Sequence, residues 1–244
     1  MSALSATEQE LQKHFNAFHA ARAASDLVTR LYAEAMGDAY PVEVAASSSC
    51  DFTLLGTMVT RLCLRPGQVL ADIGCGTGGV GLWLARALAL RLTGVDISPT
   101  AIELAAARRP AFLPQGRAQF RVGTLEATGL PGGHAHGVVC VDAMSNATDR
   151  TAALREIHRI LHPGRAMITR AVRKDSGTAY GEQAKNAEST STNGPANPPC
   201  GGACTGCGSP TRPPFDATSV TSSRRTCCAR RTGCCPVSTG AVRA

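Results

Sequence analysis

A glycine-rich turn between a short apolar segment and a helix limits the possible folds of this chain more than any other feature. The segment VLADIGCGTGG covers residues 69–79. Residues 69–73 have the apolar run of a buried strand, and residues 80–88 have helical periodicity. Gly74, Gly76 and Gly79 form the pattern G-x-G-x-x-G, in which glycine allows the backbone to turn tightly and to approach a ligand. This order predicts the first unit of a nucleotide-binding α/β sheet.

The residues that follow continue the alternation of strands and helices. Strands are expected at 91–97, 119–122, 136–143 and, after a turn at Pro163 and Gly164, at 165–172. One helix is expected to begin with Ser98 as its N-cap and Pro99 at its first position, and a second helix covers 149–161. The pattern predicts a doubly wound, mostly parallel Rossmann-like sheet with helices on both faces.

Three regions are expected along the chain. Residues 1–64 have helical patterns and are predicted to form an N-terminal cap, and residues 65–175 carry the alternating units. Residues 176–244 contain 41 Ser, Thr, Gly, Pro or Cys among 69 positions and lack Leu, Ile and Met. A segment of this composition buries too little apolar surface to offset its ordering entropy, so we expect a disordered tail.

The residue before the glycines indicates which ligand the loop binds. Asp72 ends the first strand, and Asp96 ends the second, about 20 residues beyond the loop. A dinucleotide fold remains open, but its pyrophosphate would meet the carboxylate of Asp72. A ligand with an ammonium and a sulfonium group, such as S-adenosylmethionine, would gain from that charge. Asp96 is placed to accept both ribose hydroxyls, and Ile97 can lie against adenine.

Four segments in order resemble the successive motifs of class I S-adenosylmethionine-dependent methyltransferases. They are VLADIGCGTGG, LTGVDISPTAIELA, FRVGTLEATGLP and LREIHRILHPGRAMIT. The similarity covers about residues 5–185 and is greatest to the small-molecule branch that methylates quinones and actinobacterial natural products. It implies methyl transfer from S-adenosylmethionine to a small acceptor by direct displacement, in which the enzyme mainly positions the reactants.

The resemblance also implies which residues line the donor site. It places Asp72, Gly74, Cys75 and Gly76 at the methionine part. It places Asp96 and Ile97 at the adenosine, Thr124 and Leu125 at the adenine edge, and Asp142 toward donor or acceptor. Thr124 stands where the family commonly has an acid that binds the adenine amino group, which implies a weaker contact or one from the backbone.

The catalytic base is left open by the sequence. His134, His136 and Asp142 are the candidates, since His titrates near neutral pH, but the two histidines also fit a surface loop. The polar run Ser47 to Cys50 fits either a lid over the donor or an N-cap cluster for the next helix.

The tail holds seven of the eleven cysteines. Cys200, Cys204 and Cys207 suggest a metal or iron–sulfur site, but their spacing, like that of Cys227, Cys228, Cys234 and Cys235, also matches apolar positions of amphipathic helices. Every Cys codon read one base earlier encodes Met, Leu or Val. We therefore interpret the tail as a frameshifted C-terminus that lacks the last strands of the family's sheet and carries no metal. This truncation predicts weak donor binding and little turnover, up to an inactive protein.

Charge and hydropathy limit the partners. The net charge is +7, but 4 of these charges lie in residues 176–244, so the folded part is nearly balanced and nucleic acid is not indicated. No leader-like segment and no apolar run near 18 residues is present, so a cytoplasmic protein without a membrane partner is expected. The predicted function is S-adenosylmethionine-dependent methylation of a small molecule. The alternatives are a donor-binding module without catalysis and a nucleotide-binding fold with a metal-binding tail.

Overall fold

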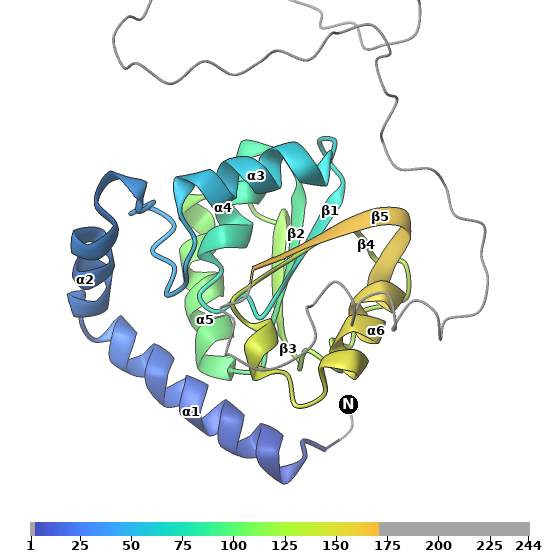
Figure 1. The fold of residues 1–244 in the computed structure, drawn as a ribbon, viewed down its shortest axis with the longest axis horizontal. Coiled ribbons are helices and arrows are strands. Elements are labelled where there is room, and N and C mark those ends of the chain that lie inside the picture. Colours follow the sequence, from blue (N-terminus) through green and yellow to red (C-terminus); the bar gives the residue numbers. More distant parts are fainter. Residues whose placement is uncertain (1–2, 171–244) are drawn as a thin grey trace, which may run out of the picture. The chain divides into compact units, whose positions relative to one another are not determined.

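Residues 3–170 are described by the computed structural model, in which five strands form one sheet flanked by helices (Figure 1). The strands are β1 (Val69–Ile73), β2 (Arg91–Asp96), β3 (Ala118–Val122), β4 (Ala135–Val141) and β5 (Leu161–Arg170). The helices are α1 (Ala6–Ala23), α2 (Leu27–Met36), α3 (Phe52–Leu62), α4 (Gly79–Ala87), α5 (Pro99–Arg108) and α6 (Arg150–Ile160), with short 3-10 turns η1 (Gly37–Ala39), η2 (Arg109–Ala111) and η3 (Met144–Asn146).

The strand order is β3-β2-β1-β4-β5, and every neighbouring pair is parallel. The chain therefore runs outward from β1 to β3 and then returns beside β1 with β4. This confirms the doubly wound parallel sheet expected from the alternating units. In such a sheet the loops diverge where the order reverses, which leaves a crevice at the carboxyl ends of β1 and β4. The expectation that the last strands of the sheet are missing concerns residues outside 3–170.

The last strand differs from its predicted limits. A turn at Pro163 and Gly164 was expected to precede it, whereas β5 begins at Leu161, immediately after α6. Ala135 pairs with Leu161 and Gly137 pairs with Ala166, so the turn residues are accommodated as an irregularity inside the strand pairing.

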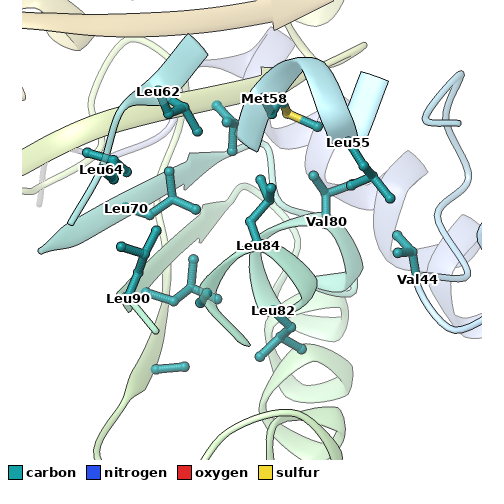
Figure 2. Close-up of a cluster of buried hydrophobic side chains, with 14 of the residues drawn as sticks. Val44, Leu55, Met58, Leu62, Leu64, Leu70, Val80, Leu82, Leu84 and Leu90 are labelled. Carbon is teal, nitrogen blue, oxygen red and sulfur yellow. The ribbon is translucent and has the colours of Figure 1, made fainter. Parts of the chain in front are cut away.

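Alternate strand residues build a core on each face of the sheet. On one face Leu70, Leu92 and Val139 pack against α3 and α4, as Figure 2 shows for part of this cluster. On the other face Ile73 and Val138 pack against α6, among other residues. Because both faces are covered, the interior strand β4 has a continuous run of apolar residues at 137–141, as expected for a parallel sheet.

The helices before the sheet differ in how they pack. Leu55, Met58 and Leu62 of α3 are buried in the same core as Leu70, whereas His19 is the only buried residue of α1. The division of the chain at residue 64 and the boundary at 175 remain predictions. No helix within residues 3–170 is long and apolar enough to cross a membrane.

The predicted start of α5 is confirmed. The Ser98 hydroxyl accepts a hydrogen bond from the backbone N–H of Ala101 at 3.1 Å, and Pro99 lies in the first turn. This cap fixes the direction in which the chain leaves β2, directly after Asp96.

Candidate functional site

A pocket lies at the carboxyl ends of β1, β2 and β4, where the strand order reverses, and α1 contributes a further wall. Its lining includes all nine residues predicted for the donor site: Asp72, Gly74, Cys75, Gly76, Asp96, Ile97, Thr124, Leu125 and Asp142. These residues come from four separate stretches of the chain. The topology of the sheet is what brings them together.

The glycine loop closes tightly over the end of β2. The backbone N–H groups of Gly74 and Cys75 both donate to the carbonyl of Val95, at 2.8 and 3.0 Å. Gly74 has a φ of +72°, and a Cβ at this position would lie 2.2 Å from the Cβ of Ala143. Only glycine combines this backbone conformation with this close approach.

Asp72 is a buried carboxyl at the end of β1. It is 3% exposed, and its Oδ2 accepts a hydrogen bond from the backbone N–H of Gly81 at 3.0 Å. Burial raises the pKa of Asp72 to about 7, and the charge of Asp96 adds to this rise. Near neutral pH this carboxyl therefore gains from a cation placed in the pocket.

Asp96 is oriented by two backbone donors. Its Oδ1 accepts from the N–H of Ser98 at 2.9 Å, and its Oδ2 accepts from the N–H of Gly76 at 2.8 Å. Burial raises the pKa of Asp96, although these two hydrogen bonds oppose the rise. The carboxylate thus links the glycine loop to the start of α5 and faces the pocket with a fixed orientation.

Cys75 completes the loop as a neutral group. It is buried, and burial raises the pKa of its thiol well above the ordinary value, so the thiol stays protonated at neutral pH. It therefore adds small apolar volume to the wall and no charge.

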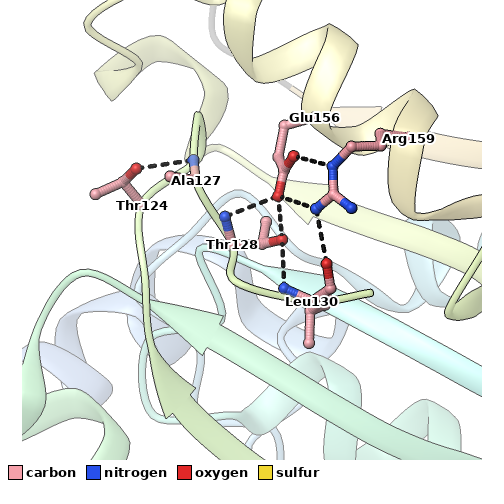
Figure 3. A network of polar contacts seen from close by, with 6 residues as sticks. All are labelled: Thr124, Ala127, Thr128, Leu130, Glu156 and Arg159. Atoms are coloured by element: carbon pink, nitrogen blue, oxygen red, sulfur yellow. Dashed lines mark hydrogen bonds and ion pairs between the residues drawn. The ribbon is translucent and has the colours of Figure 1, made fainter. Parts of the chain in front are cut away.

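The wall formed by Thr124 and Leu125 is held by a polar network from α6 (Figure 3). Glu156 accepts hydrogen bonds from the backbone N–H and the hydroxyl of Thr128 and pairs with Arg159, which also donates to the carbonyl of Leu130 at 2.7 Å. Burial opposes ionisation of Glu156, but these bonds hold its pKa below the usual range. The segment 124–130 is thereby fixed against α6.

Asp142 stands at the end of β4 with a φ of +58°, which is rare for a residue with a side chain. Its Oδ2 accepts two hydrogen bonds from Ser49, one from the backbone N–H at 2.6 Å and one from the hydroxyl at 2.7 Å. Its Oδ1 is buried and has no hydrogen-bond partner within the described residues. One carboxylate oxygen is therefore anchored, and the other is a buried acceptor without a partner in the described residues.

The polar run at residues 47–50 lies at the pocket, which is the position that a lid over the donor would have. Ser47 and Ser48 line the pocket, and Ser49 holds Asp142. The N-cap of α3 is instead Asp51, whose carboxylate accepts from the N–H of Leu54 at 2.6 Å. The N-cap interpretation of the serines was therefore wrong.

The structure does not bring His134 or His136 to the pocket. The Nε2 atom of His134 lies 3.0 Å from the hydroxyl of Thr93. The Nδ1 atom of His136 accepts from the N–H of Val69, the first residue of β1, and its ring packs against that of His162 with centroids 4.4 Å apart. Because His136 is hydrogen-bonded to the first residue of β1, it lies at the amino-terminal end of the parallel strands, whereas the pocket is at their carboxyl ends. Of the three candidate bases, only Asp142 lines the pocket.

Five lining residues from α1 were missed at the sequence level: Glu8, Leu11, Phe15, Phe18 and His19. His19 is 5% exposed, and its Nδ1 is buried without a hydrogen-bond partner. Burial lowers the pKa of His19, although the charge of Asp96 opposes this. The spacing of Glu8, Gln12, Asn16 and His19, at intervals of four, four and three, is the sequence signal that predicts a shared helix face.

The carboxyl groups that line the pocket are not balanced by basic Lys or Arg side chains in the described residues. Five carboxyl side chains line it, and no Lys or Arg is among the lining residues in the described part of the chain. A pyrophosphate would meet only negative charge here, whereas a ligand with an ammonium and a sulfonium would be attracted. The residues present therefore fit the predicted donor and not a dinucleotide.

Metal binding finds no support within residues 3–170, where no group of three or more His, Cys, Asp or Glu side chains is arranged to hold an ion. The proposed frameshift and the cysteines Cys200, Cys204 and Cys207 lie outside the described residues. The frameshift and the absence of a metal at these cysteines therefore remain predictions.

Comparison with known proteins agrees with this geometry. Residues 70–164 match the family model described as a methyltransferase domain. An O-methyltransferase of Pyrenophora dematioidea is 31% identical over 107 residues, which cover 44% of this chain and 40% of that protein. The 27-O-demethylrifamycin SV methyltransferase of Amycolatopsis mediterranei is 28% identical over 159 residues, covering 65% of this chain and 56% of that protein. The chain thus spans about two fifths to just over half of these relatives.

A solved structure supports the fold independently. A geranyl diphosphate methyltransferase in complex with geranyl diphosphate and sinefungin has a TM-score of 0.53 and 19% sequence identity, with 67% of this chain and 65% of that chain covered. At this identity the similarity concerns the fold alone.

Proposed function

We propose that this protein, whose residues 70–164 match the model of a methyltransferase domain, is a class I S-adenosylmethionine-dependent methyltransferase that transfers a methyl group from S-adenosylmethionine to a hydroxyl group of a small organic acceptor. The hydroxyl is proposed from the relatives, several of which are O-methyltransferases. We further propose that the acceptor is a diffusible molecule of the cytoplasm, not nucleic acid or a membrane component.

The observation that supports this proposal most strongly is the pocket lined by five carboxyl groups and no Lys or Arg within the described residues. S-adenosylmethionine carries two positive groups and no phosphate, so it suits this charge. The glycine loop supplies close backbone approach at the same place, because Gly74 has no side chain to fill the space beside Ala143.

The residues divide into two groups by role. Asp72 and the loop Gly74 to Gly76 would hold the methionine part of the donor, and Asp96 would accept its ribose hydroxyls. When bound, S-adenosylmethionine supplies a methyl group activated by a positively charged sulfur. The chain contributes position and exclusion of water, which are the main sources of catalysis for a direct displacement.

Asp142 is the residue we propose to take the acceptor's proton. Ser49 donates two hydrogen bonds to Oδ2, which orients the carboxylate and leaves Oδ1 without a partner. As the acceptor oxygen bonds to the methyl carbon, the bond from that carbon to the donor's sulfur would break, S-adenosylhomocysteine would leave, and the hydroxyl proton would pass to Oδ1. A fixed carboxylate at this position would avoid a charged oxygen intermediate.

The test uses the full-length protein with S-adenosylmethionine labelled with tritium in the methyl group. Phenols, hydroquinones and hydroxylated polyketides serve as acceptors, and labelled product is separated and counted. We expect label on at least one acceptor, and we expect Asp142→Asn to lower kcat more than it changes the dissociation constant of the donor. Glu10→Gln, an exposed change on α1, serves as the control.

Two results would speak against the proposal in different ways. Donor binding without labelled product from any acceptor would favour a donor-binding module. Label on amines but never on hydroxyls would keep methyl transfer and refute the acceptor class.

A further inference from the structure

The first helix, α1, contacts the loop after β2 and the start of α5 through polar side chains. A surface helix normally packs through an apolar stripe. In α1, however, Gln12 donates from Nε2 to the carbonyl of Ile97 at 2.9 Å, and Asn16 accepts at Oδ1 from the hydroxyl of Ser98 at 2.6 Å. Gln12 and Asn16 are four residues apart, so they lie on one face of the helix. This face points at the loop that follows β2.

The same face carries Glu8 one turn before Gln12 and His19 one turn after Asn16. Both line the pocket. Because Gln12 contacts Ile97 and His19 lies beside Gly76, α1 runs along the half of the pocket formed by the ends of β2 and β3. Glu8 is thereby brought to Thr124, which follows β3.

The carboxylate of Glu8 is oriented and ionised. Its Oε2 accepts two hydrogen bonds from Ser5, from the backbone N–H at 2.8 Å and from the hydroxyl at 2.7 Å, as part of a capping box. These bonds, with a smaller contribution from the nearby Thr124 hydroxyl, hold the pKa of Glu8 below its usual value. Both Ser5 bonds end on Oε2, so Ser5 leaves Oε1 for a ligand.

Thr124 supplies the complementary group. It is 6% exposed, and its hydroxyl oxygen accepts from the N–H of Ala127 at 3.0 Å, so its single proton can turn either to Glu8 or to a ligand. A carboxylate oxygen beside a hydroxyl donor matches the edge of adenine, where the 6-amino group donates and the neighbouring N1 accepts. A 6-oxo purine would present an oxygen to the carboxylate instead.

We propose that Glu8 of α1 recognises the 6-amino group of the donor's adenine, with Thr124 as its neighbour. This inference rests on the proposed function, because it assumes a nucleoside in the pocket. It assigns a specificity role to a residue of the N-terminal helix, outside the matched domain at residues 70–164.

The experiment measures dissociation constants of the full-length protein by calorimetry for two product analogues, S-adenosylhomocysteine and S-inosylhomocysteine, which differ at position 6 of the purine. We expect the wild type to prefer the adenine form by about 10- to 100-fold, the range of a charged hydrogen bond. Glu8→Gln keeps the capping box, because Gln also serves at this position, but removes the charge. We expect its preference to fall to within about 3-fold, since an amide can either donate or accept.

Two matched variants separate recognition from helix stability. Ser5→Ala removes the capping hydroxyl but keeps the backbone N–H that donates to Glu8 Oε2, so both analogues should weaken equally and the adenine preference should remain. Glu10→Gln removes an exposed acid of the same helix and should change neither constant. Thermal melting of each variant shows that it is folded.

The inference is overturned if Glu8→Gln keeps the wild-type preference, or if Ser5→Ala abolishes the preference to the same extent. If the wild type binds neither analogue, the proposed function fails together with the inference. If the wild type binds both equally well, the donor site stands and only the role of Glu8 is refuted.

Discussion

Replacing Asp72 by Asn should make the fold more stable while weakening donor binding. Asp72 is 3% exposed, and burial raises its pKa to about 7 from an ordinary value of 3.8. In the folded protein the carboxyl therefore binds a proton between these two pH values, whereas in the unfolded chain it does not. The free energy of unfolding of the wild type falls as the pH rises from 3.8 to about 7, and stays lowered above that range.

The magnitude follows from the size of the shift. A difference of about three pH units corresponds to about 4 kcal/mol of lost stability at pH 8, at 1.36 kcal/mol per unit. Asn carries no charge at any pH, and its side-chain carbonyl can still accept from the N–H of Gly81. The buried side-chain NH2 group of Asn loses its hydration, and this cost cancels about 1–3 kcal/mol of the stability gained by removing the charge. A net gain of about 2 kcal/mol at pH 8 would raise the Tm by about 4–8 °C.

The assay is urea unfolding of wild type and Asp72→Asn at pH 5 and pH 8, in a reducing buffer because of the cysteines. The advantage of the variant should be larger at pH 8 than at pH 5 by about 2–3 kcal/mol. In calorimetry, the more stable variant Asp72→Asn should bind the donor more weakly than the wild type does. Wild-type affinity should rise as the pH increases through about 7, and the variant should bind weakly at every pH. An equal stability difference at both pH values, or a less stable variant at pH 8, would refute the reasoning.

Three further predictions come from the same geometry. Gly74→Ala should abolish donor binding and lower the Tm, since the added Cβ would lie 2.2 Å from that of Ala143 at a φ of +72°; unchanged binding in calorimetry would contradict this. His134→Gln should leave kcat and donor affinity within about 2-fold of the wild type, because His134 does not line the pocket, and a loss of turnover would return it as a candidate base. Ser49→Ala should lower kcat about 10-fold by removing one of the two hydrogen bonds that hold Asp142, with donor affinity kept; a change in affinity alone would show that Asp142 contacts the donor only.

Local signals were sufficient for the part of the site built by β1 and β2. The carboxyl ends of two apolar strands fix Asp72 and Asp96, and a glycine pattern between a strand and a helix fixes the loop. Because the strands are parallel, both acids lie at the carboxyl ends of the strands, on the same side of the sheet. These features depend on neighbouring residues in the chain and on the handedness of the crossover, so the sequence predicts them well.

The rest of the site depends on contacts between distant segments. Ser49 and Asp142 are 93 residues apart, and no local pattern indicates their hydrogen bonds. The role of α1 was missed because its helical pattern predicts only an N-terminal cap and does not show that Leu11, Phe15 and Phe18 line the pocket. Conversely, His136 was a candidate base by residue type, but it lies beside the amino end of β1, and the pocket is at the carboxyl ends.

The central claim is that a pocket lined only by acidic charge binds S-adenosylmethionine. The most direct test is a calorimetric titration of the full-length protein at pH 8 with S-adenosylmethionine, and separately with NAD. The account predicts saturable binding of S-adenosylmethionine at one site, competition by S-adenosylhomocysteine, and no binding of NAD. Binding of NAD, or the same affinity for S-adenosylmethionine in Asp72→Asn as in the wild type, would contradict it.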